Sequence, residues 1–141
     1  MEDRKIKTHK FSTAKLQNLV AESVCRTLRF DLLNLEHDME KYKEQINPNC
    51  CIFERKEFVQ IYVATHAERI GDTLRESINS IFSQQELEAA YSNYYMPIFE
   101  KLYEHFKKKT SGDTMLNNVI LMMLEYRVEG YIQEELHRAD Y

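Results

Sequence analysis

The sequence predicts an all-α fold, a compact bundle of helices in a single domain that spans residues 1–141. Apolar residues recur at alternating spacings of three and four along most of the chain, the repeat of an amphipathic helix. Only three glycines and two prolines are present, too few turn formers for a many-stranded sheet. With 43% hydrophobic residues, a chain of 141 residues can bury a core of its own.

The first helix is expected to begin at Ser12 or Thr13, residue types that cap helix N-termini, after a flexible basic arm at residues 1–11. Its apolar stripe predicts one continuous helix or two collinear ones, ended where Asn47 precedes a proline. The stripe could pack inside the bundle, or it could form the seam of a coiled-coil dimer. Its members are Ala21, Cys25, Leu28, Leu32, Leu35, Met39, Tyr42 and Ile46.

The second and third helices are expected over residues 54–82 and from residue 84 onward. Ser83 and Glu86 have the spacing of a capping box, which starts the third helix. Pro97 lacks a backbone donor, so it predicts a kink or a break within the aromatic-rich segment that follows. The apolar stripe of the second helix consists of Val59, Val63, Ala67, Ile70, Leu74 and Ile81.

The last helix is expected to begin near Thr114, after a loop at residues 107–113 in which Gly112 suits a turn, and either Asp113 or Thr114 suits the cap of the helix. The segment "MLNNVILMMLEY" is apolar on nearly every side, which is typical of a helix surrounded by others. We therefore expect it to be the central helix of the bundle. Gly130 is expected to bend or end it before a polar tail.

Composition restricts the classes of function. A net charge of −4 argues against nucleic-acid binding. The longest apolar run, "VILMML" at residues 119–124, is far shorter than a membrane span, so no stable membrane insertion is expected. Three cysteines without a pairing pattern, and the lack of a signal-peptide pattern, predict free thiols in a cytoplasmic protein.

No constellation of residues predicts catalysis. Glu134 and His137 have the spacing of a di-iron half-site in a helical bundle, but the sequence holds no second Glu-x-x-His. His66 borders an apolar stripe and is expected to be partly buried and hydrogen-bonded. No glycine-rich phosphate loop is present. We predict a protein that is not an enzyme and needs no cofactor or metal.

Gly71 lies in the middle of the predicted second helix, where glycine costs roughly 1 kcal/mol relative to alanine. It follows Ile70 of the apolar stripe, so a partner helix or groove wall could approach closely there. Asp72 falls away from the stripe, where its carboxylate could meet a cation. Alternatively, Gly71 admits a bulky neighbour within the bundle and Asp72 is merely solvated.

The segment "IYVATHAERIGDTLRESI", residues 61–78, resembles the third Bcl-homology motif of the B-cell-lymphoma (Bcl) family of apoptosis regulators. Ala67 stands where the family has leucine, and Asn118 where it has the arginine of its first homology region. The order of helices is also similar to that of the family, including its divergent viral members. The motif positions are the anchors Val63, Ala67, Ile70 and Leu74 with the small-acidic pair Gly71 and Asp72.

This resemblance implies a Bcl-like topology and an apoptosis regulator. Its partners would be pro-death Bcl-family proteins, whose amphipathic death-motif helix enters a groove between the second, third and central helices. Residues 61–78 could instead be the guest in another protein's groove. The alternatives are an adaptor that homodimerises through the stripe at residues 21–46, and an apolar small-molecule carrier. Besides the motif positions, the candidate partner-binding residues are Tyr95, Phe99, Tyr103 and Asn118.

Overall fold

A computed structural model describes residues 12–92 and 95–130, and within these ranges it contains helices and no strand. The all-α prediction is confirmed for this part of the chain. The predicted basic arm at residues 1–11 and the polar tail with Glu134 and His137 lie outside it. The elements in order are α2 (Thr13–Leu33), α3 (Leu35–Lys41), the 3-10 helix η1 (Cys51–Phe53), α4 (Lys56–Thr65), α5 (Ala67–Ile81), α6 (Gln84–Ser92), α7 (Met96–Lys108) and α8 (Thr114–Glu129).

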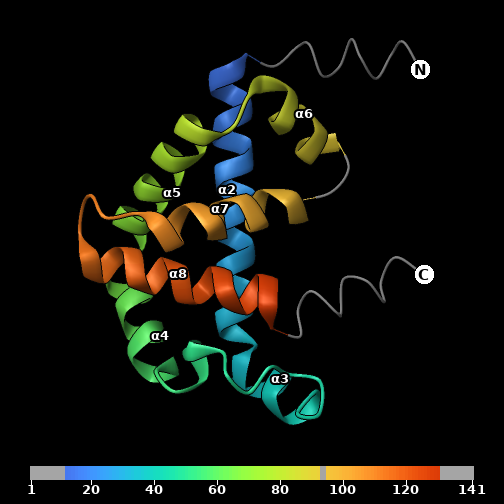
Figure 1. Cartoon of the computed structure of the whole chain (residues 1–141), viewed down its shortest axis with the longest axis vertical. Helices are drawn as coiled ribbons and strands as arrows, with labels where there is room; N and C mark the ends of the chain where they lie inside the picture. Colours follow the sequence, from blue (N-terminus) through green and yellow to red (C-terminus); the bar gives the residue numbers. More distant parts are fainter. Residues whose placement is uncertain (1–11, 93–94, 131–141) are drawn as a thin grey trace.

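Helices α2 and α8 each contact several of the other elements. Helix α2 packs against α5, α6 and α8 and continues into α3 at its end. Helices α7 and α8 pack against each other and cross α2 at a steep angle (Figure 1). Helix α8 also contacts η1 and α4. The long helix is therefore in contact on more than one side, and most of its stripe lies in the core.

Helix starts follow the predicted caps. Ser12 accepts a hydrogen bond from the backbone N–H of Lys15, and Asp113 accepts one from Leu116. Ser83 and Glu86 form the reciprocal bonds of a capping box at 2.9 and 3.2 Å. Gly112 has the positive φ of 86° that its turn requires. These confirmed features depend only on residues close in sequence.

Two of the expected helices are interrupted, and for the first of them the sequence had left open one continuous helix or two collinear ones. The first ends at Leu33, resumes as α3 and stops at Lys41, so the stripe positions 42–46 lie in turns. The second divides at His66 into α4 and α5. At each break a side chain donates a hydrogen bond to the carbonyl four residues back: Asn34 to Phe30 at 2.9 Å and Thr65 to Ile61 at 2.9 Å. Such bonds bend helices.

The expected break at Pro97 is confirmed, because α6 ends at Ser92 and α7 begins at Met96 with the proline in its first turn. Gly130 ends α8, as expected. The core draws on most of these elements. Its largest fully buried side chains are Leu16, Leu28, Leu35, Ile52, Leu74, Ile78, Leu87, Met96, Leu102, Ile120, Leu124 and Tyr126.

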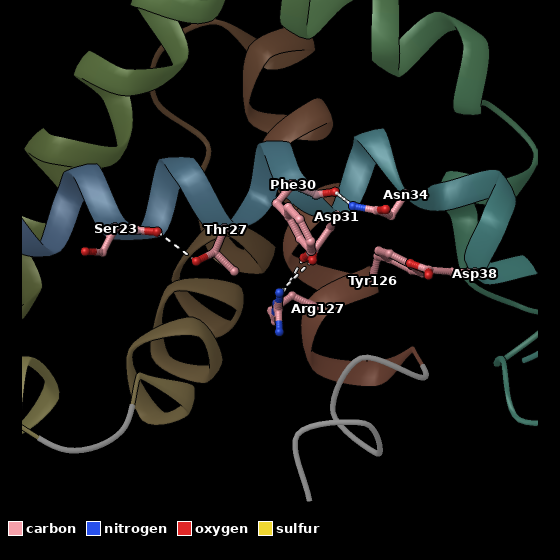
Figure 2. A network of polar contacts seen from close by, with 8 residues as sticks. All are labelled: Ser23, Thr27, Phe30, Asp31, Asn34, Asp38, Tyr126 and Arg127. Atoms are coloured by element: carbon pink, nitrogen blue, oxygen red, sulfur yellow. Dashed lines mark hydrogen bonds and ion pairs between the residues drawn. The ribbon is translucent and has the colours of Figure 1, made fainter. Parts of the chain in front are cut away.

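An ion pair in the core joins α2 to α8. The Arg127 guanidinium donates two hydrogen bonds to Asp31, Nε to Oδ2 at 3.0 Å and Nη2 to Oδ1 at 2.6 Å. Both residues are buried, and Figure 2 shows Arg127 pointing at Asp31 across the helix interface. Tyr126 donates its hydroxyl to Asp38 at 3.2 Å. Burial raises the pKa of Asp31 to about 7, although Arg127 opposes that shift.

Removing one member of this pair is expected to cost far more stability than removing both. Asp31→Leu leaves a buried guanidinium without its carboxylate, so we expect the free energy of unfolding to fall by about 3–5 kcal/mol. Adding Arg127→Met to it should recover most of that loss. The matched control is Glu36→Gln in the exposed pair with Lys56, expected to cost less than about 1 kcal/mol. Urea unfolding measures all three, and equal losses for Asp31→Leu and Glu36→Gln would contradict the prediction.

Candidate functional site

A cavity of about 480 Å³ lies between α2 on one side and α4 and α5 on the other, with Met123 of α8 also in its lining. We call it the α2–α5 cavity. Its volume is within the range of about 300–1,000 Å³ that ligand sites occupy. Most of its lining is apolar, and the apolar members besides Met123 are Ala21, Leu28, Phe30, Leu33, Val63, Ala67, Ile70 and Leu74.

Gly71 opens onto this cavity. A Cβ atom built at Gly71 would meet no atom of another element within 4 Å. The interpretation that Gly71 admits a bulky neighbour of its own bundle is therefore wrong. The missing side chain instead enlarges an open space, where an outside group could come close to the α5 backbone.

Arginines border the α2–α5 cavity on both walls. Arg26 and Arg29 come from α2, and Arg75 comes from α5, with Glu22 as the one acidic residue of the lining. Arg75 Nη1 donates to Asp72 Oδ1 at 3.1 Å, while its buried Nε–H has no acceptor among the described residues. An unpaired buried donor costs about 1–3 kcal/mol, so this N–H would gain from an acceptor brought by a ligand.

Two large apolar side chains of α2 lie exposed at the edge of the same cavity. Phe30 is 62% exposed and Leu33 is 84% exposed, although both line the cavity. Exposed apolar residues that adjoin an apolar hollow mark an interaction surface more often than residues scattered singly. Phe30 and Leu33 thus extend the apolar area beyond the cavity itself.

Cys25 lies in the lining of the α2–α5 cavity and is partly buried. Burial raises the pKa of its thiol, and the nearby Arg29 and Arg75 guanidinium groups oppose the shift. The thiol is therefore mostly protonated near neutral pH. All three cysteines are free, which agrees with the predicted free thiols.

The structure divides the ten predicted partner-binding residues among several places. Five of them line the α2–α5 cavity: Val63, Ala67, Ile70, Gly71 and Leu74. The wall that faces them is α2, whereas the resemblance implied the third and central helices.

The other five predicted residues are not part of the lining of this cavity. Tyr95 and Phe99 line a second cavity of about 410 Å³ near Arg127. Tyr103 donates its hydroxyl to Glu129 at 2.8 Å, and burial, followed by this bond, raises its pKa. Asn118 and Asp72 are exposed.

The α2 wall was missed because sequence periodicity shows which residues share a helix face but not which helix faces them. Arg26 and Arg29 resemble ordinary solvated positions between buried apolar residues. One signal was available: Phe30 and Leu33 are large apolar residues that fall outside the predicted stripe. An apolar residue off the buried stripe of an amphipathic helix is a candidate for a second contact surface.

The apolar stripe at residues 21–46 packs mainly within the chain itself. Leu28, Leu32 and Leu35 are at least 95% buried against the other helices. A dimer seam through them would require the bundle to open. A charged residue at Leu32 or Leu35 would consequently damage the fold, so its effect cannot identify a dimer.

Other kinds of site have little support in the described ranges. The described ranges contain no group of three His, Cys, Asp or Glu residues placed to hold a metal ion. Within the same ranges, no helix is long and apolar enough to cross a membrane. His66 is partly exposed and its ring contacts that of Tyr62, with the ring centroids 4.4 Å apart and the planes tilted by 44°.

Gly71 and Gly130 are expected to respond to alanine in opposite ways. Gly71→Ala adds a side chain in open space and improves helix propensity, so we expect unfolding free energy to rise by about 0.5–1 kcal/mol. Gly130→Ala would place Cβ 2.6 Å from the Tyr126 carbonyl oxygen and must lower stability. Thermal and urea unfolding compare the two variants. A loss of stability in Gly71→Ala would mean that its surroundings are not open.

Comparison of the chain with protein-family models, with curated proteins and with solved structures finds no match. The candidate site therefore has to be interpreted from its own chemistry.

Proposed function

We propose that the protein binds an amphipathic helix of a partner protein in the α2–α5 cavity and thereby regulates apoptosis as a divergent Bcl-like protein. The observation that carries the binding proposal is Gly71, a helix-interior glycine whose open side adjoins an apolar cavity. No neighbour among the described residues accounts for the glycine. A guest helix packed against α5 at this position would use the space that the missing side chain leaves.

The Bcl assignment has separate support. Helix α5 carries Ile70, Gly71, Asp72 and Leu74 in the order of the third homology motif. The succession of helices also agrees with a Bcl-like topology in which α8 takes the place of the central helix. Leu116, Ile120 and Leu124 of α8 are all buried. We propose this topology together with the function.

Binding would be driven by apolar burial. The cavity accepts a few side chains, and fully burying each aliphatic or aromatic anchor contributes about 1.5–3 kcal/mol. A small number of such anchors usually supplies most of the affinity of a helix in a groove. Phe30 and Leu33 would lose their exposure to solvent in the same complex.

The test is calorimetric titration of the protein with peptides that carry pro-death Bcl-homology helices. We expect at least one peptide to bind with a Kd below about 1 μM. Gly71→Leu should weaken that peptide at least tenfold, because the new side chain occupies the approach to α5. The matched control is Asn79→Leu, at an exposed position of α5 outside the cavity lining, which should leave the Kd unchanged. If no peptide of the panel binds to the folded protein, the proposed apoptotic function is wrong.

Cys25 provides an independent test of where the peptide binds. In a Cys51→Ser variant, Cys25 is the accessible thiol of the described chain, because Cys50 is buried and burial raises its pKa to about 12. A saturating peptide should slow alkylation of Cys25, followed by mass spectrometry, at least tenfold, since Cys25 lies in the cavity lining. Binding that leaves the alkylation rate unchanged would place the peptide elsewhere.

A further inference from the structure

Two arginines of the α2–α5 cavity, Arg26 and Arg29, differ from the other described arginines of the chain. Arg69 pairs with Asp113, Arg127 pairs with Asp31, and Arg55 stacks on Phe58. Arg26 and Arg29 have no carboxylate within ion-pair distance among the described residues. Two guanidinium groups without a carboxylate partner in the described part of the chain thus border an apolar cavity, in a chain whose net charge is −4.

The opposite wall carries one arginine, which is paired with a carboxylate but keeps an unused donor. Arg75 of α5 also lines the cavity, and its bond to Asp72 uses Nη1 and leaves Nε–H without an acceptor in the described part of the chain. Guanidinium groups bind carboxylates through two parallel N–H bonds, with Nε among the usual donors. The lining therefore carries guanidinium donors on both walls with apolar residues between them, and its three arginines outnumber its one acidic residue, Glu22.

We infer that the α2–α5 cavity selects an amphipathic helix whose apolar face is bordered by Asp or Glu residues. Arg26 and Arg29 on α2 and Arg75 on α5 bind those carboxylates, while the apolar face fills the cavity. This inference rests on the proposed function and specifies the partner's chemistry. Its basis is charge complementarity, which sets specificity and the rate of association more than total affinity.

The same charges oppose a second copy of the chain as the occupant. A symmetric dimer would bring the same surface patch of both copies together. Arg26 and Arg29 of one copy would then approach arginines of the other, and like charges across an interface are unfavourable. An acidic helix from a different protein meets no such repulsion.

The experiment uses three synthetic helical peptides with one shared apolar face. The flanking positions carry Glu in the first peptide, Gln in the second and Lys in the third. Fluorescence anisotropy with the whole protein should show the Glu peptide binding at least tenfold more tightly than the Gln peptide, and the Lys peptide more weakly still. Added salt should reduce the preference, because it screens exposed charges.

Two variants assign the effect to the cavity. The double variant Arg26→Gln with Arg29→Gln should remove most of the preference for Glu over Gln, measured as the ratio of the two Kd values in the same variant. The control, Arg55→Gln, alters an arginine of α4's N-terminal flank outside the cavity lining and should leave the preference intact. If sedimentation of the protein alone detects a dimer, that dimer should persist in the double variant.

The outcomes separate the two proposals. Equal binding of the Glu and Gln peptides, both weakened by Gly71→Leu, would overturn the acidic preference while helix binding stands. A preference unchanged in the double variant would also overturn it, since other cations would then be responsible. If none of these three peptides and no peptide of the pro-death panel binds to the protein, both proposals are wrong. A dimer that needs Arg26 and Arg29 would make a second copy the occupant.

Discussion

The buried ion pair between Asp31 and Arg127 is the constraint on which the arrangement of the helices depends. Its two hydrogen bonds fix the rotation of α2 relative to α8, because a buried charge cannot move away from its counterion without a large desolvation cost. With this rotation fixed, Leu28 points into the core. Arg26 and Arg29 lie on the side of α2 that faces the α2–α5 cavity. The internal pair thus determines which α2 residues a partner can reach.

Features of the fold that have a specific local sequence pattern were predictable, and features without such a pattern were not. The caps at Ser12, Ser83 and Asp113 need only a few neighbouring residues, so their sequence patterns were sufficient. The interruptions at Asn34 and His66 contain neither glycine nor proline, the residues that usually indicate a break. They depend on side-chain bonds to the backbone that many uninterrupted helices also contain, as α2 does at Thr27.

The candidate site divides in the same way. Val63 of α4 and Ala67, Ile70 and Leu74 of α5 line the same wall of the cavity, so periodicity grouped them correctly although the helix is interrupted at His66. The facing wall belongs to α2, which lies much earlier in the chain. Arg127 gave no signal, because a charged residue next to an apolar run looks like a solvated helix end. Its burial follows only from the position of Asp31, 96 residues away.

The glycines at positions 71 and 130 carry different consequences for natural variation. Position 130 is restricted by geometry, because any β-carbon there meets the carbonyl oxygen of Tyr126. A descendant of this chain that keeps the end of α8 unchanged must therefore keep a glycine. Position 71 is sterically free, and a single base change converts a glycine codon to an alanine codon. Drift toward alanine at position 71 would accompany loss of the interaction, so sequence variation at this one position records whether the cavity is in use.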